Sequence, residues 1–127
     1  MTEPGKVSGK RILLADDQQE VREMTKLMLG MDEHIVTEAV NGREALELFA
    51  PDRFDLVITD YLMPVMKGDE LARNIKRLAP TAPILMITGS AAELDGIQMS
   101  VDAVLNKPFR FEELRQAVAQ LLRPVPI

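Results

Sequence analysis

The fold of this chain is decided by residues 54–68, which read FDLVITDYLMPVMKG. Within them, Leu56 to Ile58 form an apolar, β-branched run that is too short for a helix and is typical of a strand buried on both faces. Asp60 stands where this strand ends. Other apolar runs along the chain also end in polar residues: Asp16 and Asp17, Thr88, and Lys107. If these runs are parallel strands, the polar groups meet at one edge of a sheet, which we interpret as the functional site.

Strand-like and helix-like segments alternate along the whole chain. The further strands are predicted at residues 11–15, 35–40, 84–87 and 103–105. The helices are predicted at about residues 19–30, 45–49, 71–78, 91–99 and 111–121. This alternation indicates an α/β fold of five βα units with right-handed crossovers, in which five strands form one doubly wound parallel sheet.

The polarity of the second strand predicts the order of the sheet. Thr37 and Glu38 interrupt the apolar character of residues 35–40, so this strand is expected at an edge. The resulting order is 2-1-3-4-5, with a cleft at the carboxyl ends of strands 1 and 3. Gly96 weakens the predicted fourth helix over residues 91–99, which is therefore expected to be short.

Composition limits the classes of protein that the chain can represent. Its 127 residues, 46% of them hydrophobic, suit one domain at residues 10–123, with a flexible leader at 1–9 and a tail at 124–127. The net charge of -5 argues against direct nucleic-acid binding, which requires clustered basic residues. The sequence has no cysteine, no signal segment and no run of membrane-spanning length. We therefore expect a cytoplasmic protein without membrane insertion.

The first predicted helix has an apolar stripe. Four of its residues recur at helical spacing and indicate an amphipathic helix: Val21, Met24, Leu27 and Met28. The methionines, including Met24, Met28 and Met31, are expected to fill the core. His34, the only histidine, comes just before the edge strand and is expected to be exposed.

The predicted cleft holds three carboxylates, from Asp16, Asp17 and Asp60. Charges so close together repel unless some groups are protonated or a cation neutralises them. Mg2+ is the natural candidate, because it prefers carboxylate oxygens and often shares its remaining positions with phosphate oxygens. Lys107 and the Thr88 hydroxyl would offer a positive charge and a hydrogen-bond donor to an approaching anion. This combination suits phosphoryl transfer to a carboxylate.

Taken together, these residues resemble the receiver domain of two-component response regulators over roughly residues 10–122. The resemblance depends on the following residues in this order: Asp16-Asp17, Asp60 with Met63-Pro64 and Gly68 behind it, Thr88, and Lys107-Pro108-Phe109. It implies a flavodoxin-like fold and a signalling phosphoacceptor in a phosphorelay. Such a module is not an enzyme, although it takes part in its own phosphoryl transfer and dephosphorylation.

The resemblance also implies a role for each acidic residue. Asp60 would be the phosphoacceptor and would contribute to the metal site. Asp17 would be a direct Mg2+ ligand, and Asp16 would act through a water molecule or as a second ligand. Leu62 would add its backbone carbonyl to the metal site.

The resemblance implies roles for Thr88 and Lys107, and the chain also departs from the usual pattern of the family. Thr88 would bind a phosphoryl oxygen, and Lys107 would pair with the phosphate, its peptide bond to Pro108 being cis. Val104 stands three residues before the lysine, where receivers usually carry Tyr or Phe as part of the switch. The segment from Thr88 to Lys107 is also about one helical turn shorter than usual.

The phosphoryl donor is expected to come from outside, because the chain has one histidine and no kinase-sized region. The resemblance implies a partner histidine kinase or histidine phosphotransfer protein as the donor, and output by contact with a downstream protein effector. A small phosphodonor is an alternative source. We expect a monomer or weak dimer. The chain represents either a single-domain regulator or a receiver fragment of a hybrid kinase or larger regulator.

Two other functional classes fit the same fold less well. A phosphohydrolase with an aspartate nucleophile would carry Asp-x-Asp after the first strand, where this chain has Asp16-Asp17. A flavodoxin-like cofactor binder would carry a phosphate loop rich in Ser, Thr and Gly, whereas the acidic segment 16–20 would repel phosphate. Leu62, two residues after the acceptor, has no polar group to position an attacking water. This predicts a long-lived phosphoryl group.

Overall fold

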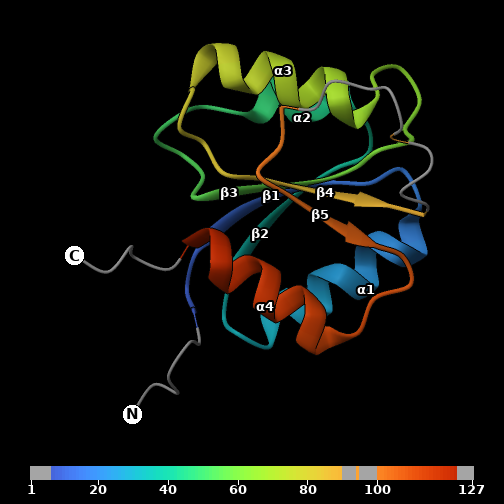
Figure 1. Cartoon of the computed structure of the whole chain (residues 1–127), viewed down its shortest axis with the longest axis vertical. Helices are drawn as coiled ribbons and strands as arrows, with labels where there is room; N and C mark the ends of the chain where they lie inside the picture. Colours follow the sequence, from blue (N-terminus) through green and yellow to red (C-terminus); the bar gives the residue numbers. More distant parts are fainter. Residues whose placement is uncertain (1–6, 90–93, 95–99, 123–127) are drawn as a thin grey trace.

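A five-stranded parallel sheet with helices on both faces forms the molecule (Figure 1). The structure is a computed structural model that describes residues 7–89, residue 94 and residues 100–122. The strands are β1 (Arg11–Ala15), β2 (Ile35–Ala39), β3 (Leu56–Asp60), β4 (Ile84–Thr88) and β5 (Ala103–Asn106). The helices are α1 (Gln19–Gly30), α2 (Gly42–Leu48), α3 (Gly68–Leu78) and α4 (Phe111–Leu122).

The strand order is β2-β1-β3-β4-β5, and each neighbouring pair is parallel, which confirms the prediction from the sequence. Every residue of the central strands β3 and β4 is buried, as their uninterrupted apolar runs indicate. The predicted edge strand β2 is mostly half-exposed. Because β3 lies between β1 and β4, the residues at its carboxyl end face groups from both neighbours.

The structure describes four helices and not the five that the sequence predicts. The remaining helix was predicted at residues 91–99, which lie outside the described part of the chain except for Leu94. The tail at 124–127 and most of the leader at 1–9 also fall outside it. Among the described helices, none is long and apolar enough to cross a membrane.

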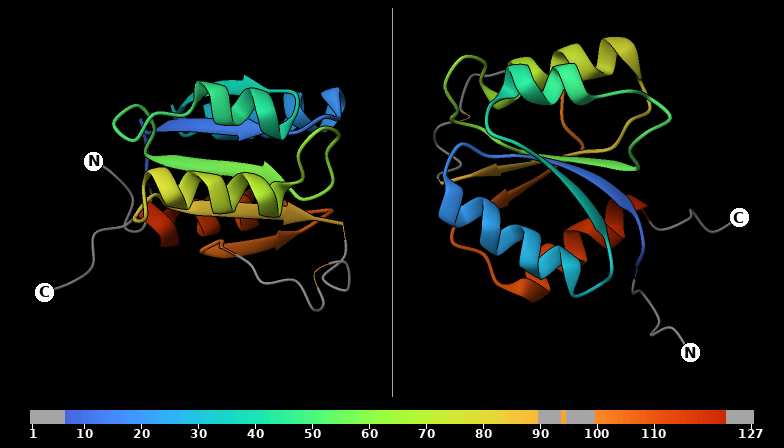
Figure 2. Two further views of the ribbon diagram at one scale, coloured as in Figure 1. Left: turned by 90° about the horizontal axis from the view of Figure 1, so that it is seen from above. Right: turned by 180° about the vertical axis from the view of Figure 1, so that it is seen from behind.

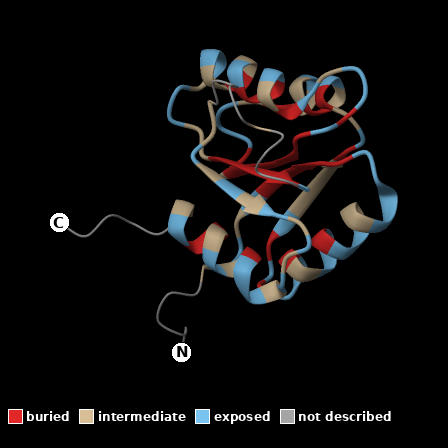
Figure 3. Ribbon diagram, turned by 45° about the vertical axis from the view of Figure 1, so that its right-hand side comes forward, coloured by how far each residue is buried: buried red, intermediate tan, exposed pale blue. Residues whose placement is uncertain are grey.

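The two faces of the sheet are covered by different pairs of helices (Figure 2). Strand alternation sends Leu13 and Val57 to one face, where they pack with α2 and α3. It sends Leu14 and Ile58 to the other face, where they pack with α1 and α4. The buried residues accordingly form a continuous central layer along the strands and the inner sides of the helices (Figure 3).

Helix α1 forms where predicted, but part of its apolar stripe faces solvent. Thr25 and Leu29 are the buried residues of α1, whereas Met24 and Leu27 on the stripe are 54% and 68% exposed. Met31, just after the helix, is 67% exposed. The prediction that the methionines fill the core is therefore wrong for Met24 and Met31. Thr25 can be buried because its hydroxyl donates to the Val21 carbonyl at 2.8 Å, which leaves no unpaired polar group.

His34 is buried, contrary to the expectation that it is exposed. Its Nδ1 atom accepts a hydrogen bond from the Lys10 backbone N–H at 3.0 Å. Burial lowers the pKa of His34, the charge of Asp32 opposes this shift, and that of Lys10 adds to it. The imidazole therefore stabilises the junction between the start of β1 and the start of β2.

Gly68 positions α3 against the end of β3. Its N–H donates to the Tyr61 carbonyl at 2.8 Å, and a Cβ atom at this position would collide with the backbone carbonyl of Asp60. Only glycine allows the first turn of α3 to approach the strand so closely. The loop at residues 61–67 is thereby held beside the carboxyl end of the sheet.

Candidate functional site

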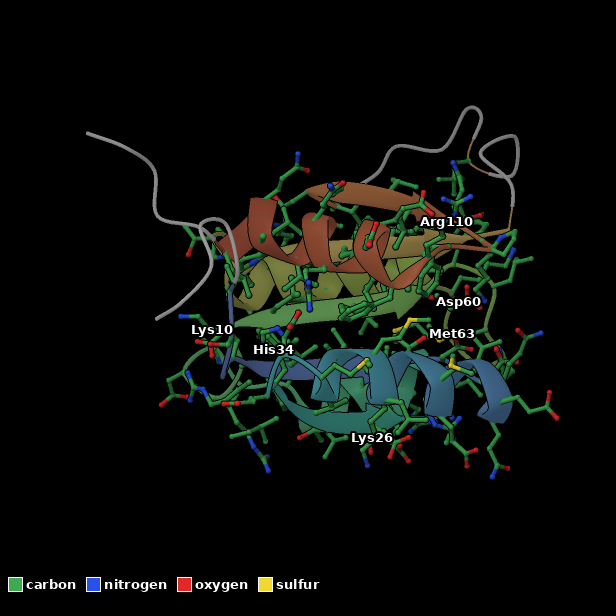
Figure 4. The ribbon with its side chains drawn as sticks, turned by 90° about the horizontal axis from the view of Figure 1, so that it is seen from below. Lys10, Lys26, His34, Asp60, Met63 and Arg110 are labelled. Atoms are coloured by element: carbon green, nitrogen blue, oxygen red, sulfur yellow. The ribbon has the colours of Figure 1, made fainter. Side chains whose placement is uncertain are left out.

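Asp60 is the last residue of β3 and lies at the carboxyl end of the sheet, opposite the end that holds Lys10 and His34 (Figure 4). Its side chain is only 8% exposed. A buried carboxylate needs partners that compensate for the loss of water. These partners come from the carboxyl ends of other strands of the sheet, as the sequence predicts.

Lys107 is the positively charged partner. Its Nζ atom lies 3.1 Å from Asp60 Oδ1 and 3.8 Å from Asp16 Oδ2. The backbone N–H of Lys107 donates to the Thr88 carbonyl at 2.7 Å, which joins the segment after β5 to the end of β4. The peptide bond to Pro108 is cis, as the resemblance implies. One lysine thus contacts two carboxylates, one at the end of β3 and one just after β1.

Asp16, Asp17 and Asp60 each place a carboxylate oxygen so that all three atoms lie within 4.8 Å of one another. Asp16 is buried, and its Oδ1 atom accepts a hydrogen bond from the Gln18 N–H at 2.9 Å. Asp17 is exposed, and its carboxylate has no hydrogen-bond or ion-pair partner among the described residues. The predicted acidic cluster therefore exists and includes one carboxylate that is open to a ligand.

The electrostatics of the cluster favour binding of a cation. Burial raises the pKa of Asp60; the hydrogen bond and charge of Lys107 oppose this shift, and the charges of Asp16 and Asp17 add to it. Burial also raises the pKa of Asp16, against the opposing effects of the Gln18 N–H and Lys107. The single charge of Lys107 does not offset three carboxylates. A divalent cation with oxygen preference would remove the remaining repulsion.

The other predicted residues of the site lie around this cluster. Thr88 is the buried last residue of β4, one position beyond the residue that pairs with Asp60 in the sheet register. Leu62 lies two residues after Asp60 and is 48% exposed. Val104 lies in β5 and is 43% exposed. A small apolar side chain therefore lies at the surface where the resemblance leads us to expect an aromatic ring.

An apolar groove begins beside Lys107. It is lined from α1 by Val21, Met24, Thr25 and Met28, and from the segment after β5 by Pro108 and Phe109. The sequence analysis identified this α1 stripe but assigned it to the core. The groove places an exposed apolar surface beside Lys107, the residue whose Nζ atom contacts Asp60.

Sequence reasoning also missed Arg22, whose guanidinium contacts the loop that carries the acidic pair. Its hydrogen-bond acceptor there is a backbone carbonyl. Because every residue has such a carbonyl, no residue type in the sequence marked this contact in advance.

Comparisons with known proteins point to one family. The profile of the response regulator receiver domain family matches residues 12–119. The response regulator MprA of Mycolicibacterium vanbaalenii is 40% identical over 116 residues, which cover 89% of this chain and 50% of that protein. The MprA of Mycobacterium ulcerans is 38% identical over the same shares. The chain thus spans about half the length of the curated relatives it matches.

Solved structures show the same likeness. The response regulator TrrA of Thermotoga maritima, solved in complex with Mg2+ and BeF, is 35% identical with a TM-score of 0.83, and the match covers 89% of this chain and 99% of that one. The chemotaxis protein CheY4 of Vibrio cholerae is 31% identical with a TM-score of 0.81, over 91% and 100% of the two chains.

Proposed function

Because this chain belongs to the response regulator receiver domain family, we propose that it is a phosphoacceptor of two-component signalling in which Asp60 receives the phosphoryl group. One observation carries the proposal. Oxygens of Asp16, Asp17 and Asp60 lie within 4.8 Å of one another, and Lys107 Nζ lies 3.1 Å from the Asp60 carboxylate. A nucleophilic carboxylate, a cation-binding cluster and a fixed positive charge are the components that phosphoryl transfer to aspartate requires.

The three carboxylates fit a bound Mg2+ ion, because the single charge of Lys107 relieves only part of their mutual repulsion and Asp17 is open to a ligand. In our proposal Asp17 and Asp60 provide direct oxygen ligands, Asp16 acts through water or as a second ligand, and the Leu62 carbonyl completes the protein's contribution. When bound, the ion would neutralise charge on the oxygens of the transferring group. The likeness to TrrA of Thermotoga maritima, which was solved in complex with Mg2+ and BeF, supports this choice of metal.

In the proposed reaction, a carboxylate oxygen of Asp60 attacks the phosphorus of the donor. The new P–O bond forms as the bond between phosphorus and the leaving atom of the donor breaks, and the leaving atom keeps the electron pair. Lys107 Nζ pairs with the transferring oxygens, and the Thr88 hydroxyl donates a hydrogen bond to one of them. Water later hydrolyses the acyl phosphate. The chain thus takes part in its own phosphoryl transfer but has no separate substrate that it turns over.

We propose that the donor is a partner histidine kinase or histidine phosphotransfer protein. The single histidine, His34, is buried at the end of the sheet opposite Asp60 and cannot supply the phosphoryl group within the same molecule (Figure 4). A protein donor must bring its phosphohistidine to the carboxyl edge of the sheet. The groove lined by Met24, Met28 and Phe109 beside Lys107 offers that donor an apolar contact surface.

The output of the proposed signal is contact with a downstream protein effector, in the cytoplasm. A net charge of -5 does not favour direct binding to nucleic acid. The curated relatives are about twice as long as this chain, so an effector region on the same polypeptide remains an alternative to a separate protein.

The proposal predicts that Mg2+ and a small phosphodonor such as acetyl phosphate label the purified protein to about one phosphoryl group per chain. The label should be absent when EDTA removes the metal, because three carboxylates without a cation repel a phosphate. Intact-protein mass spectrometry measures the incorporation. Continuous release of inorganic phosphate from a phosphate ester, without lasting incorporation, would instead identify a hydrolase.

The lifetime of the acyl phosphate is expected to be long, because the Leu62 side chain cannot position an attacking water. Replacing Leu62 with asparagine should shorten the half-life of the acyl phosphate about tenfold. This change is smaller than the effect of an ideally placed general base. The decay is measured after removal of the phosphodonor. Val65→Asn is the matched control, since Val65 lies in the same loop and is 71% exposed. Rapid decay of the wild-type protein would contradict the prediction.

A further inference from the structure

Arg22 joins three parts of the fold at the edge of the candidate site. Its side chain projects from α1 and is only 13% exposed. The Nη1 atom donates to the backbone carbonyl of Asp16 at 2.9 Å, and the Nε atom donates to Glu38 Oε1 at 3.2 Å. Glu38 lies in the edge strand β2. The guanidinium therefore spans from that strand to the loop that carries the acidic pair.

The carbonyl that Arg22 holds belongs to the peptide group between Asp16 and Asp17. This group is planar, so fixing its oxygen also fixes the direction in which the chain enters Asp17. On the other side of Asp16, its N–H donates to the Ala39 carbonyl at 3.1 Å. The backbone of Asp16 is thus tied at both its N–H and its carbonyl. Asp17, in contrast, has no side-chain partner among the described residues, so the backbone sets the point and direction from which its carboxylate extends.

The acceptor that orients Arg22 is itself held in place. Glu38 Oε2 accepts from Lys26 Nζ at 3.1 Å, so both oxygens of this carboxylate are engaged. The Lys26 hydrogen bond lowers the pKa of Glu38; burial opposes this shift, and the contacts with Arg22 add to it. Arg22 is the member of this chain of contacts that reaches the site, and its forked geometry allows two directed bonds at once.

We propose that Arg22 is a positioning residue for the divalent cation: it orients the Asp16–Asp17 peptide group so that the Asp17 carboxylate faces the metal. The inference rests on the proposed function, because it requires the acidic cluster to bind Mg2+. Arg22 itself touches neither metal nor phosphate. Partners of this kind, one step removed from a metal ligand, typically change metal affinity by 10- to 100-fold when they are removed.

The direction of the change in Mg2+ affinity distinguishes a positioning role of Arg22 from an effect of its charge alone. Arg22 is a cation near a cation-binding cluster, so its charge alone weakens Mg2+ binding, and its removal should tighten binding. Positioning predicts the opposite result. A loss of affinity on removal of Arg22 therefore cannot be an electrostatic consequence of the lost charge.

The test compares three variants by isothermal titration calorimetry with Mg2+ alone, in the absence of a phosphodonor. Arg22→Met should raise the Mg2+ dissociation constant about tenfold. Arg22→Lys keeps the charge but loses the fork, and should also weaken binding. Arg43→Met is the matched control: it removes the same charge from an exposed pair with Glu47, 3.5 Å apart, and should leave the dissociation constant unchanged. Circular dichroism establishes that each variant is folded.

A second measurement distinguishes a positioning role of Arg22 from general damage to the site. At saturating Mg2+, Arg22→Met should incorporate phosphoryl groups from acetyl phosphate at a rate close to that of the wild type, because the metal then restores the geometry. Unchanged or tighter Mg2+ binding in both Arg22 variants would overturn the inference while the proposed function stands. Wild-type protein that bound no Mg2+ would overturn both.

Discussion

Asp60→Ala is expected to abolish phosphoryl incorporation from every donor. The substitution removes the only atom that forms the new P–O bond, and Asp16 and Asp17 are expected to be committed to the metal. Radiolabelled acetyl phosphate with saturating Mg2+ should leave no label above background. The loss should be the same with a phosphorylated protein donor, because both donors react at the same oxygen.

Asp55→Ala is the matched control for this variant. Asp55 stands just before β3, at the opposite end of the same strand, and its carboxylate pairs with Arg11 at 3.1 Å. The Asp55→Ala variant lacks one aspartate of the same segment and should be labelled as efficiently as the wild-type protein. Substantial labelling of Asp60→Ala would show that another residue is the acceptor.

Lys107→Met is expected to lower the labelling rate about 100-fold, as loss of one preorganised donor at a developing negative charge typically does. The Nζ atom lies 3.1 Å from Asp60 Oδ1 and is the fixed positive charge beside the acceptor. Methionine keeps most of the apolar stem, so the loss reports on the charge. Mg2+ binding should not weaken, because removal of a nearby cation favours another. Calorimetry and a labelling time course at saturating Mg2+ measure the two effects.

Lys76→Met controls for the loss of a paired, partly buried lysine. The side chains of Lys76 and Lys107 are 22% and 21% exposed, and Lys76 Nζ pairs with Asp102 at 2.8 Å. Lys76→Met should lower stability and leave the labelling rate unchanged. A Lys107→Met rate within threefold of the wild type would remove Lys107 from the mechanism.

The sheet and the acidic cluster could be predicted because each depends on a strong local signal. Uninterrupted apolar runs mark β3 and β4 as central, and Thr37 and Glu38 mark β2 as an edge. Parallel strands then bring the residues that follow them to one end of the sheet. The convergence of Asp16, Asp60 and Lys107 needs no further information.

Side-chain orientation was harder to predict where the apolar pattern was broad. The stripe on α1 spans more of the helix than the core can cover, so the periodicity identified the helix but not its buried side. The core takes Leu29 and Thr25, a polar residue whose hydroxyl is satisfied within the helix. His34 was misplaced for a related reason, because its backbone partner on Lys10 comes from a distant part of the sequence.

Backbone geometry in the loop after Asp60 also lay beyond sequence reasoning. Val65 has a φ angle of 72°, and the Met66 N–H donates to the Pro64 carbonyl at 2.7 Å, which forms a tight three-residue turn. A β-branched residue is disfavoured in this region, so its type gave no signal for the turn. Gly68, in contrast, stands where a close approach to β3 requires glycine.

The central claim is that one carboxylate, Asp60, accepts a phosphoryl group with the help of Mg2+ and Lys107. The most direct measurement is site mapping of the wild-type protein after incubation with Mg2+ and acetyl phosphate. Peptides from a rapid acidic digest are sequenced by tandem mass spectrometry. The account predicts one added phosphoryl group, on Asp60, that hydroxylamine removes. A phosphoryl group on a different residue, or none in the presence of Mg2+, would contradict it.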